Sequence, residues 1–118
     1  MSERSDITNY VDKEAALLRL RGNIKLYRRM LDMLLNSEEF GKLESALARQ
    51  DFAGAADAAH AIKGITGNLA LPLLFDLSSR LMVDLRNGTI NDRILEEYRA
   101  ALTETFARVR EVAGEINA

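Results

Sequence analysis

The sequence predicts an all-α protein, an antiparallel up-down four-helix bundle preceded by one or two short N-terminal helices. Apolar residues recur at spacings of three and four over most of the 118 residues, which is the period of an amphipathic helix. No segment alternates apolar and polar residues with a period of two, so we expect no strands. Short connections between long amphipathic helices favour antiparallel neighbours. We therefore treat residues 1–118 as a single helical domain.

The composition narrows the classes of function. Hydrophobic residues make up 47% and charged residues 29% of the chain, an ordinary balance for a soluble globular protein. The net charge of −2 gives no basic surface for nucleic acid. The absence of cysteine excludes disulfides, cysteine-ligated zinc and thiol chemistry. Residues 1–10 lack the apolar run that a signal peptide would have. No stretch approaches the roughly 18 consecutive apolar residues that a membrane-spanning helix needs. We therefore expect a cytoplasmic protein that binds neither nucleic acid nor membrane.

A capping residue and a glycine delimit the first predicted helix. Residues 1–11 are polar, and we expect them to be partly disordered. Asp12 is a good N-cap for a short helix over residues 13–21. Gly22 is a natural stop, because the residue just after a helix often takes the left-handed conformation. This segment is the expected short N-terminal helix.

The next predicted helix starts after Asn23, a second favourable N-cap. Its apolar residues occupy more than one face, so we expect it to be buried on more than one side. Asn36 and Ser37 either break this helix or lie within it, because apolar residues continue at helical spacing beyond them. The apolar positions are Ile24, Leu26, Tyr27, Met30, Leu31, Met33, Leu34 and Leu35, followed by Phe40, Leu43 and Leu47.

Three helices complete the bundle. Asp51 is the predicted N-cap of a helix over residues 52–70. Pro72 suits the first turn of the following helix, where its missing N–H is no loss, and Gly88 ends that helix. Leu74, Leu77, Leu81 and Leu85 form the apolar seam of that helix, and the last helix, capped by Asn91, has Ile94, Leu95, Tyr98, Leu102, Phe106, Val109, Ala113 and Ile116.

The helix over residues 52–70 contains His60, the only histidine in the chain. At about 100° per residue, the apolar side chains of this helix share one broad stripe, which we expect to be buried. His60 points roughly 150° away from the centre of the stripe, so we expect its imidazole to be exposed. The stripe consists of Phe52, Ala55, Ala58, Ala59, Ile62, Ile65 and Leu69.

Small residues surround His60 on its own face, and Lys63 is the one long side chain beside it. Each of two glycines within this helix costs about 1 kcal/mol relative to alanine, so local stability does not explain them. Without large neighbours the imidazole stands clear of the surface, and the concave active site of a partner could close over it. The neighbours at i−7, i−4, i+4 and i+7 are Ala53, Ala56, Gly64 and Gly67.

The segments HAIKG at 60–64 and GNL at 67–69 resemble the phosphorylation motif of histidine-containing phosphotransfer (HPt) domains. In that family the pattern is His-x-x-Lys-Gly with Asn-Leu soon after. The resemblance implies a four-helix bundle with short extra N-terminal helices. It also implies that His60 is phosphorylated on a ring nitrogen and exchanges the phosphoryl group with an aspartate of a response-regulator receiver domain.

The residues around the motif fit this chemistry. An unperturbed imidazole pKa near 6.5 leaves a neutral, nucleophilic nitrogen at cellular pH. The ammonium of Lys63 lies about one helical turn away and would offset the phosphoryl charge, although the simpler reading is a surface lysine. We expect Ala53, Ala56, Asp57, Gly64 and Gly67 to form a docking surface for the partner, with Gly64 alternatively permitting close helix packing, and Asn68 to be structural, bonding backbone near the turn at residues 70–72.

The resemblance extends over most of the chain, with two departures at packing positions. The family often has glycine two residues after the asparagine, where this chain has Ala70. It often has Leu-Glu in the next helix, where this chain has Leu81 and Met82. Both departures concern the packing of the adjoining helix pair.

The resemblance implies an HPt protein of a two-component multistep phosphorelay, with receiver domains and a hybrid histidine kinase as partners. The receiver would supply the catalytic carboxylates and a divalent metal. The sequence has neither a Walker-type phosphate loop nor a kinase signature, so we expect no ATP binding, no autonomous kinase activity and no cofactor. We expect no metal site in this chain and a monomer in solution.

Two other functions are compatible with the residues. The bundle could be an adaptor that binds a receiver domain or kinase without accepting phosphate. It could also be a phosphatase of a receiver aspartyl-phosphate, which would release inorganic phosphate without a lasting phosphohistidine. A metal enzyme is the least favoured, because one histidine and no cysteine leave only carboxylates as further ligands.

Overall fold

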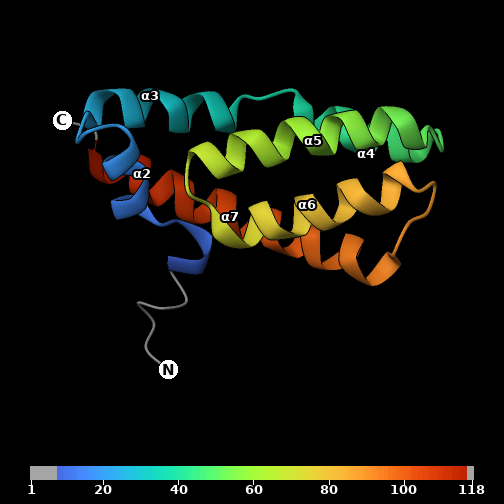
Figure 1. Cartoon of the computed structure of the whole chain (residues 1–118). Helices are drawn as coiled ribbons and strands as arrows, with labels where there is room; N and C mark the ends of the chain where they lie inside the picture. Colours follow the sequence, from blue (N-terminus) through green and yellow to red (C-terminus); the bar gives the residue numbers. More distant parts are fainter. Residues whose placement is uncertain (1–7, 117–118) are drawn as a thin grey trace.

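The structure, a computed structural model, describes residues 8–116, and this part of the chain is helical without a single strand. This confirms the predicted all-α class. Residues 8–10 are also helical, ahead of the longer elements. In chain order these are α2 (Lys13–Arg19), α3 (Ile24–Leu35), α4 (Glu39–Ala48), α5 (Phe52–Asn68), α6 (Pro72–Arg86) and α7 (Asp92–Ile116), as drawn in Figure 1.

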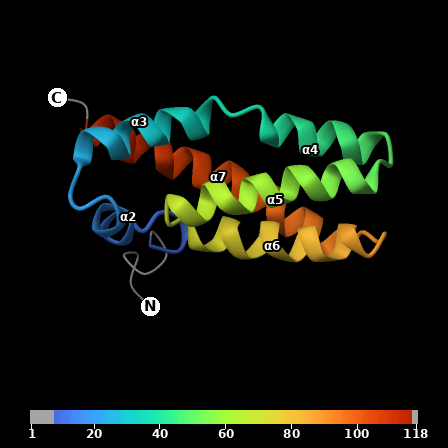
Figure 2. The ribbon, with the colours of Figure 1, turned by 45° about the horizontal axis from the view of Figure 1, so that its top comes forward.

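The bundle has four antiparallel arms. α3 and α4 follow one another along the first arm, and α5 returns beside α4 (Figures 1 and 2). α6 runs beside α5, and α7 packs against α6 and α3. This is the up-down order that short connections predict. As a result α5 lies between α4 and α6, and part of its surface remains uncovered.

The four helices with a predicted side-chain cap, α2, α3, α5 and α7, begin where the sequence predicts, and all four caps are formed. In each case the side-chain oxygen of the capping residue accepts a hydrogen bond from the backbone N–H three residues later. The donor–acceptor distances are 3.1 Å for Ala15 to Asp12, 3.0 Å for Leu26 to Asn23, 2.9 Å for Gly54 to Asp51 and 3.1 Å for Ile94 to Asn91.

The first arm is broken after Leu35. The side-chain amide of Asn36 donates to the carbonyl of Asp32 at 2.9 Å, and the hydroxyl of Ser37 accepts from the backbone N–H of Glu39 at 3.2 Å. Polar side chains that bond nearby backbone in this way compete with the helical ladder. Of the two alternatives that the sequence leaves open, the structure shows the break.

Two helices end earlier than predicted, α2 at residue 19 and α5 at residue 68. In the turn after α5, Ala70 has a φ of 55° and the N–H of Leu71 donates to the carbonyl of Thr66 at 3.0 Å. This is a left-handed closing turn that normally favours glycine, and an L-residue there costs about 1 kcal/mol or more. The position of Ala70 is the one at which the HPt pattern often has glycine.

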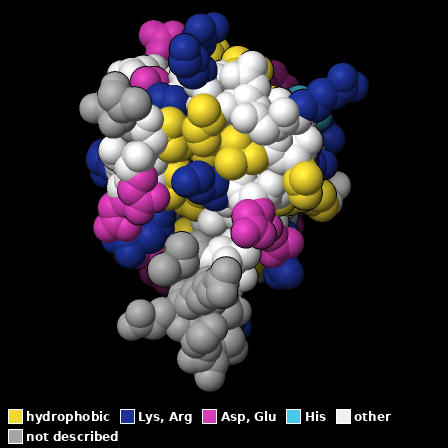
Figure 3. Space-filling view, turned by 90° about the vertical axis from the view of Figure 1, so that its left-hand side faces the viewer, with side chains coloured by type: hydrophobic (Ala, Val, Ile, Leu, Met, Phe, Trp, Pro, Cys, Tyr) yellow, Lys and Arg dark blue, Asp and Glu magenta, His cyan; other side chains and the backbone are white. Residues whose placement is uncertain are grey.

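α2 docks on the end of the bundle. The N–H of Asp12 donates to the carbonyl of Ala70 at 2.9 Å, which ties the start of α2 to the α5–α6 turn. Val11 beside it is only 4% exposed, so the expected disorder of residues 1–11 does not hold for its last residues, while 1–7 lie outside the described range. Figure 3 looks onto this end and shows hydrophobic side chains gathered on its surface. One exposed apolar residue of α2 is Leu18, at 80%.

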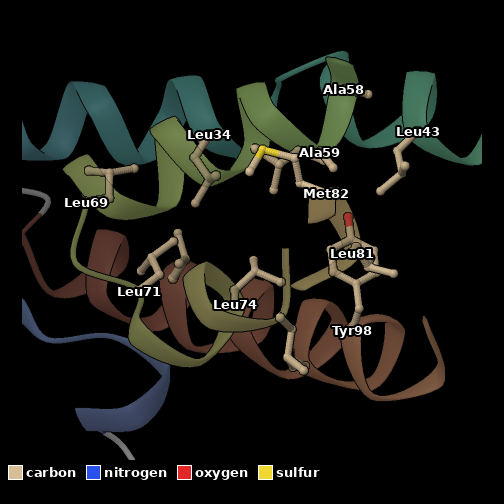
Figure 4. Packing of buried hydrophobic residues seen from close by; sticks show 14 of the residues in the cluster. Leu34, Leu43, Ala58, Ala59, Leu69, Leu71, Leu74, Leu81, Met82 and Tyr98 are labelled. Atoms are coloured by element: carbon tan, nitrogen blue, oxygen red, sulfur yellow. The ribbon is translucent and has the colours of Figure 1, made fainter. Parts of the chain in front are cut away.

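The core lies between the arms and is filled mainly by leucine and alanine (Figure 4). The predicted seam of α6 is confirmed, because all four of its leucines are buried. In α7 the seam is shifted, with Ala101 and Thr105 buried while Leu102 and Phe106 are only half-buried. The buried residues of the two helices are Leu74, Leu77, Ser78, Leu81, Met82 and Leu85 in α6, and Tyr98, Ala101, Thr105, Val109 and Ala113 in α7.

α5 packs against both α4 and α6, and apart from Ile62 its buried side chains are small. The hydroxyl of Thr66 donates to the carbonyl of Ile62 at 2.8 Å, and that of Ser78 on α6 donates to Leu74 at 2.6 Å. These hydroxyls are therefore satisfied within their own helices and need no partner across the interface. Small side chains allow α4 and α6 to approach α5 closely.

A second set of contacts joins α4 to α7 and closes the ring of arms. The guanidinium of Arg99 donates to Glu44 through Nε at 3.0 Å and Nη2 at 2.6 Å. The rings of Phe40 and Phe106 meet edge to face with centroids 5.1 Å apart. A bidentate arginine–carboxylate pair and an aromatic pair of this geometry each favour one arrangement of the two helices.

We predict that replacing Tyr27 by phenylalanine makes the protein less sensitive to alkaline pH. Burial, and secondarily the charge of Asp12, raises the pKa of Tyr27 to about 12, and its hydroxyl has no hydrogen-bond partner among the described residues. A phenol with a pKa of about 10 in the unfolded chain contributes stability below pH 10, and this stability is lost as the pH rises through 12.

The measurement is urea unfolding between pH 8 and pH 11. Tyr27→Phe should be no less stable than wild type at pH 8, and the difference in its favour should widen with pH. Tyr98→Phe is a companion variant, because burial and then the charge of Glu44 raise the pKa of Tyr98 against a smaller opposing effect of Arg99. Parallel pH profiles for wild type and Tyr27→Phe would contradict the assignment.

Candidate functional site

α5 keeps one strip of residues exposed along its whole length. Its members recur at intervals of three and four residues, so they lie on one face of the helix. The exposure predicted for His60 is confirmed, and the ring stands near the middle of this strip. The exposed strip consists of Ala53, Asp57, His60, Gly64 and Asn68.

The opposite face of α5 is buried, as the apolar stripe predicts. Only its edge residues Phe52 and Ile65 are half-buried and not fully covered. Because this face packs between α4 and α6, the helix cannot rotate about its axis without exposing core. The orientation of His60 is thus fixed by packing on the far side of its own helix. The buried members of the stripe are Ala55, Ala58, Ala59, Ile62 and Leu69.

No hydrogen bond or ion pair holds the His60 ring within residues 8–116. Its neighbours on the strip carry small side chains, apart from Asp57 one turn before it. Gly64 follows one turn later, and a Cβ built there would meet nothing within 4 Å. Internal packing therefore does not require glycine at position 64, which argues against the helix-packing reading and leaves space for a partner beside the ring.

Lys63 lies at the α6 edge of the strip and is half-buried. Its ammonium nitrogen lies 5.9 Å from the centroid of the Phe75 ring, which extends from α6. None of the ion pairs formed within residues 8–116 involves Lys63. The charge of this lysine is therefore not neutralised by a carboxylate. Lys63 follows His60 by three residues, a little less than one helical turn.

Two residues expected on the docking surface face α6 instead. Ala56 is only 4% exposed, because it is covered near the end of α6, where it borders a shallow hollow with Leu85. Gly67 faces the ring of Phe75, and a Cβ there would lie 3.0 Å from its Cε1 atom. Since α6 packs closer to the histidine face than the helical wheel suggests, the expectation that both residues share the exposed face of His60 is wrong. Ala53, Asp57 and Gly64 do share it.

Asn68 does not have the structural role expected for it. Its side chain is exposed and makes no hydrogen bond within the described range. The turn that it was expected to support is closed by backbone bonds, from Ala70 to Gly67 at 3.3 Å and from Leu71 to Thr66 at 3.0 Å. This turn is closed without the side chain of Asn68, which is left on the surface at the end of the exposed strip.

A hollow of about 390 Å³ borders the strip on the side away from α6. Sequence reasoning missed it, because Met33 is among the apolar positions of a helix expected to be buried on more than one side, whereas Met33 is 65% exposed. The sequence feature that could have indicated this hollow is the polar pair at residues 36–37, because a break in the first arm there leaves the end of α3 partly uncovered. The residues that line the hollow are Met30, Met33, Leu34, Ser37, Ile65, Asn68 and Leu69.

Residues 8–116 contain no group of three or more His, Asp or Glu side chains that could hold a metal ion. Over the same residues, none of the helices has both the length and the apolar character needed to cross a membrane.

The family model described as Hpt domain matches residues 28–112, well over half of the chain. The protein therefore belongs to the Hpt domain family, whose members take part in histidine phosphotransfer in phosphorelays and interact with receiver and kinase domains. The match includes all of α4, α5 and α6, and with them His60. No curated protein and no solved structure matches the chain significantly.

We predict different effects of alanine at the two glycines after His60. Gly64→Ala should raise the free energy of unfolding by about 0.5–1 kcal/mol, because alanine is the better helix former and the space is open. Gly67→Ala should give no such gain, since its Cβ would press on Phe75. Thermal unfolding monitored by circular dichroism measures both.

Gly41→Ala is the matched control for Gly64→Ala. Gly41 lies in α4, and a Cβ built there also meets nothing within 4 Å. It should therefore change stability in the same direction as Gly64→Ala. A destabilising Gly64→Ala beside a stabilising Gly41→Ala would show that position 64 is packed.

Proposed function

We propose that this protein is a phosphotransfer intermediate of a multistep phosphorelay, which accepts a phosphoryl group on His60 and passes it on. The observation that supports this most directly is the exposed, unpaired ring of the only histidine, placed among small residues on α5 within the Hpt match. The donor and acceptor in this proposal are aspartates of receiver domains. A hybrid histidine kinase is the proposed origin of the phosphate.

The transfer needs little from this chain beyond a nucleophile and a positive charge. The lone pair of a neutral imidazole nitrogen attacks the phosphorus of an aspartyl-phosphate. The N–P bond forms as the P–O bond to the aspartate breaks, and the aspartate leaves as a carboxylate. The other ring nitrogen then releases its proton to solvent. The reverse sequence passes the group onward.

Lys63 supplies the positive charge. Lys63 follows His60 by three residues on α5, and its ammonium carries no carboxylate partner within residues 8–116. As charge shifts onto the phosphoryl oxygens in the transition state, an unneutralised cation lowers the energy of that state more than that of the reactants. We expect Lys63 to affect the rate without forming or breaking a bond. The remaining carboxylates and a divalent metal would come from the receiver.

The surface around His60 suits a partner that binds transiently. Ala53, Asp57 and Gly64 present small or polar groups on the exposed strip, so a concave site can approach the ring. The adjoining apolar hollow, with Met33 at its rim, offers buried contact for the same partner. We propose that a receiver domain covers both, and that the protein works as a monomer in the cytoplasm.

We predict that His60→Gln abolishes phosphoryl acceptance. The protein is incubated with a phosphorylated receiver domain, and the label on each chain is followed over time together with its stability in acid. Wild type should gain acid-labile label, as phosphohistidine does, and His60→Gln should gain none. Because His60 is exposed, the substitution should leave thermal unfolding unchanged, which is the control for folding.

The other outcomes identify the competing functions. Binding of the receiver by wild type and by His60→Gln, without label on either, would indicate an adaptor. Faster release of inorganic phosphate from the receiver, without phosphohistidine, would indicate a phosphatase. Label on wild type incubated with ATP alone would contradict the proposal that it lacks kinase activity.

We predict that Met33→Glu weakens docking without changing the chemical step. A buried charge in the interface should raise the KM for the phosphorylated receiver about tenfold, which corresponds to about 1.4 kcal/mol, and leave kcat unchanged. Leu18→Glu is the matched control, because Leu18 is also an exposed apolar residue, at 80% against 65% for Met33, and it lies on α2 beside a different hollow. An equal rise in KM for both variants would contradict the assigned footprint.

A further inference from the structure

The ring of Phe75 lies in the space that the missing side chain of Gly67 leaves open. A Cβ on Gly67 would lie 3.0 Å from Cε1 and 3.2 Å from Cδ1 of that ring, distances at which the ring would have to shift. Phe75 is 37% exposed, so it forms part of the surface between α5 and α6 and is not a core residue. Glycine at position 67 thus allows an aromatic side chain of α6 to lie directly against the backbone of α5.

The same ring lies beside the ammonium of Lys63, whose nitrogen is 5.9 Å from the ring centroid. Lys63 precedes Gly67 by four residues, so the two positions are one helical turn apart on the α6 edge of the exposed strip. The ring therefore contacts α5 at one turn and attracts the lysine of the turn before it. His60 lies three residues further toward the start of the helix.

An aromatic partner differs from a carboxylate in what it does to the charge. The face of an aromatic ring attracts a cation through its quadrupole but carries no net charge of its own. A carboxylate partner would hold the ammonium too, but it would neutralise it and compete with a phosphoryl group. Phe75 can therefore restrict the flexible side chain of Lys63 while leaving its full positive charge available.

The other charged groups at this edge do not compensate Lys63. Asp76, next to Phe75 in the chain, is paired with Arg80 on its own helix at 3.1 Å. Arg19 of α2 donates a hydrogen bond to the carbonyl of Gly67, which brings a second cation to the same edge. The hollow beside these residues is lined by Phe75, Gly67 and Arg19, and also by Asp12, whose carboxylate accepts a hydrogen bond from the N–H of Ala15 and forms no ion pair with Lys63.

We propose that Phe75 is a positioning residue for phosphotransfer, which holds the ammonium of Lys63 at the edge of the His60 site, and that Gly67 is glycine to admit its ring. The proposal rests on the proposed function of His60. It gives Gly67 a part in the geometry of the site through α6 in place of direct contact with a partner. Phe75 itself touches no reacting atom.

The first test measures the geometry without any phosphate. In the ¹H–¹³C NMR spectrum, the ε-methylene protons of Lys63 should show a ring-current shift in wild type. Phe75→Leu should remove this shift, and Phe75→Tyr should retain it. Unchanged Lys63 resonances in Phe75→Leu would overturn the proposal, whatever the activity of the protein.

The second test measures the rate of phosphotransfer from a phosphorylated receiver domain to His60 in a double-mutant cycle. Phe75→Leu should slow transfer about two- to fivefold, the range expected for one exposed cation–π contact. In the Lys63→Ala background the same substitution should have no effect, and Phe75→Tyr should restore the wild-type rate. Thermal unfolding of each variant separates a loss of fold from a loss of rate.

The outcomes separate this proposal from the proposed function. Equal slowing by Phe75→Leu with and without Lys63 would overturn the positioning role, because the ring would then act on packing or docking. An absence of label on wild type would overturn the phosphotransfer function. The same rates can be measured without a receiver domain, with potassium phosphoramidate as the phosphoryl donor. In that experiment too, Phe75→Leu should slow phosphorylation of His60 only when Lys63 is present.

Discussion

The burial of the alanine-rich face of α5 between α4 and α6 is the constraint on which the site depends. Residues such as Ala55 and Ala59 have no exposed surface, so the helix cannot rotate about its axis without opening the core. This fixes which side chains of α5 face solvent. His60 needs no hydrogen bond of its own to be correctly oriented, and its ring nitrogens stay available because its position is held from the opposite side of the helix.

The glycines of α5 illustrate how one residue type meets different physical demands. Gly64 has open space around it, so its reason is not found within this chain, and a partner's surface is the remaining candidate. Gly67 has Phe75 against it, so a side chain at this position would have to displace the ring. Gly54 faces the carboxylate of Asp51, the N-cap of the helix, where a side chain would collide with the cap. All three are costs to helix stability that the bundle offsets elsewhere.

Much of the fold could be predicted because its determinants are local. Side chains such as Asp12 and Asn91 cap their own helices by accepting a hydrogen bond from the backbone N–H three residues later. A period of 3.6 residues identifies the buried stripe of α5 without knowledge of the neighbouring helices. The positions of helix ends were less predictable. Ala70 takes a left-handed conformation that its side chain disfavours, because the closing turn that bonds Leu71 to Thr66 requires it.

By itself, the sequence determined that the protein is a helical bundle and that an exposed histidine lies among small residues, since both follow from periodicity within single helices. Only the tertiary structure decided what borders that histidine. The close approach of α6 buries Ala56 and sets Phe75 against Gly67 and Lys63, while Met33 stays exposed beside the hollow between α3 and α5. These contacts join residues far apart in the chain, and no pattern within one helix specifies how closely another helix packs against it.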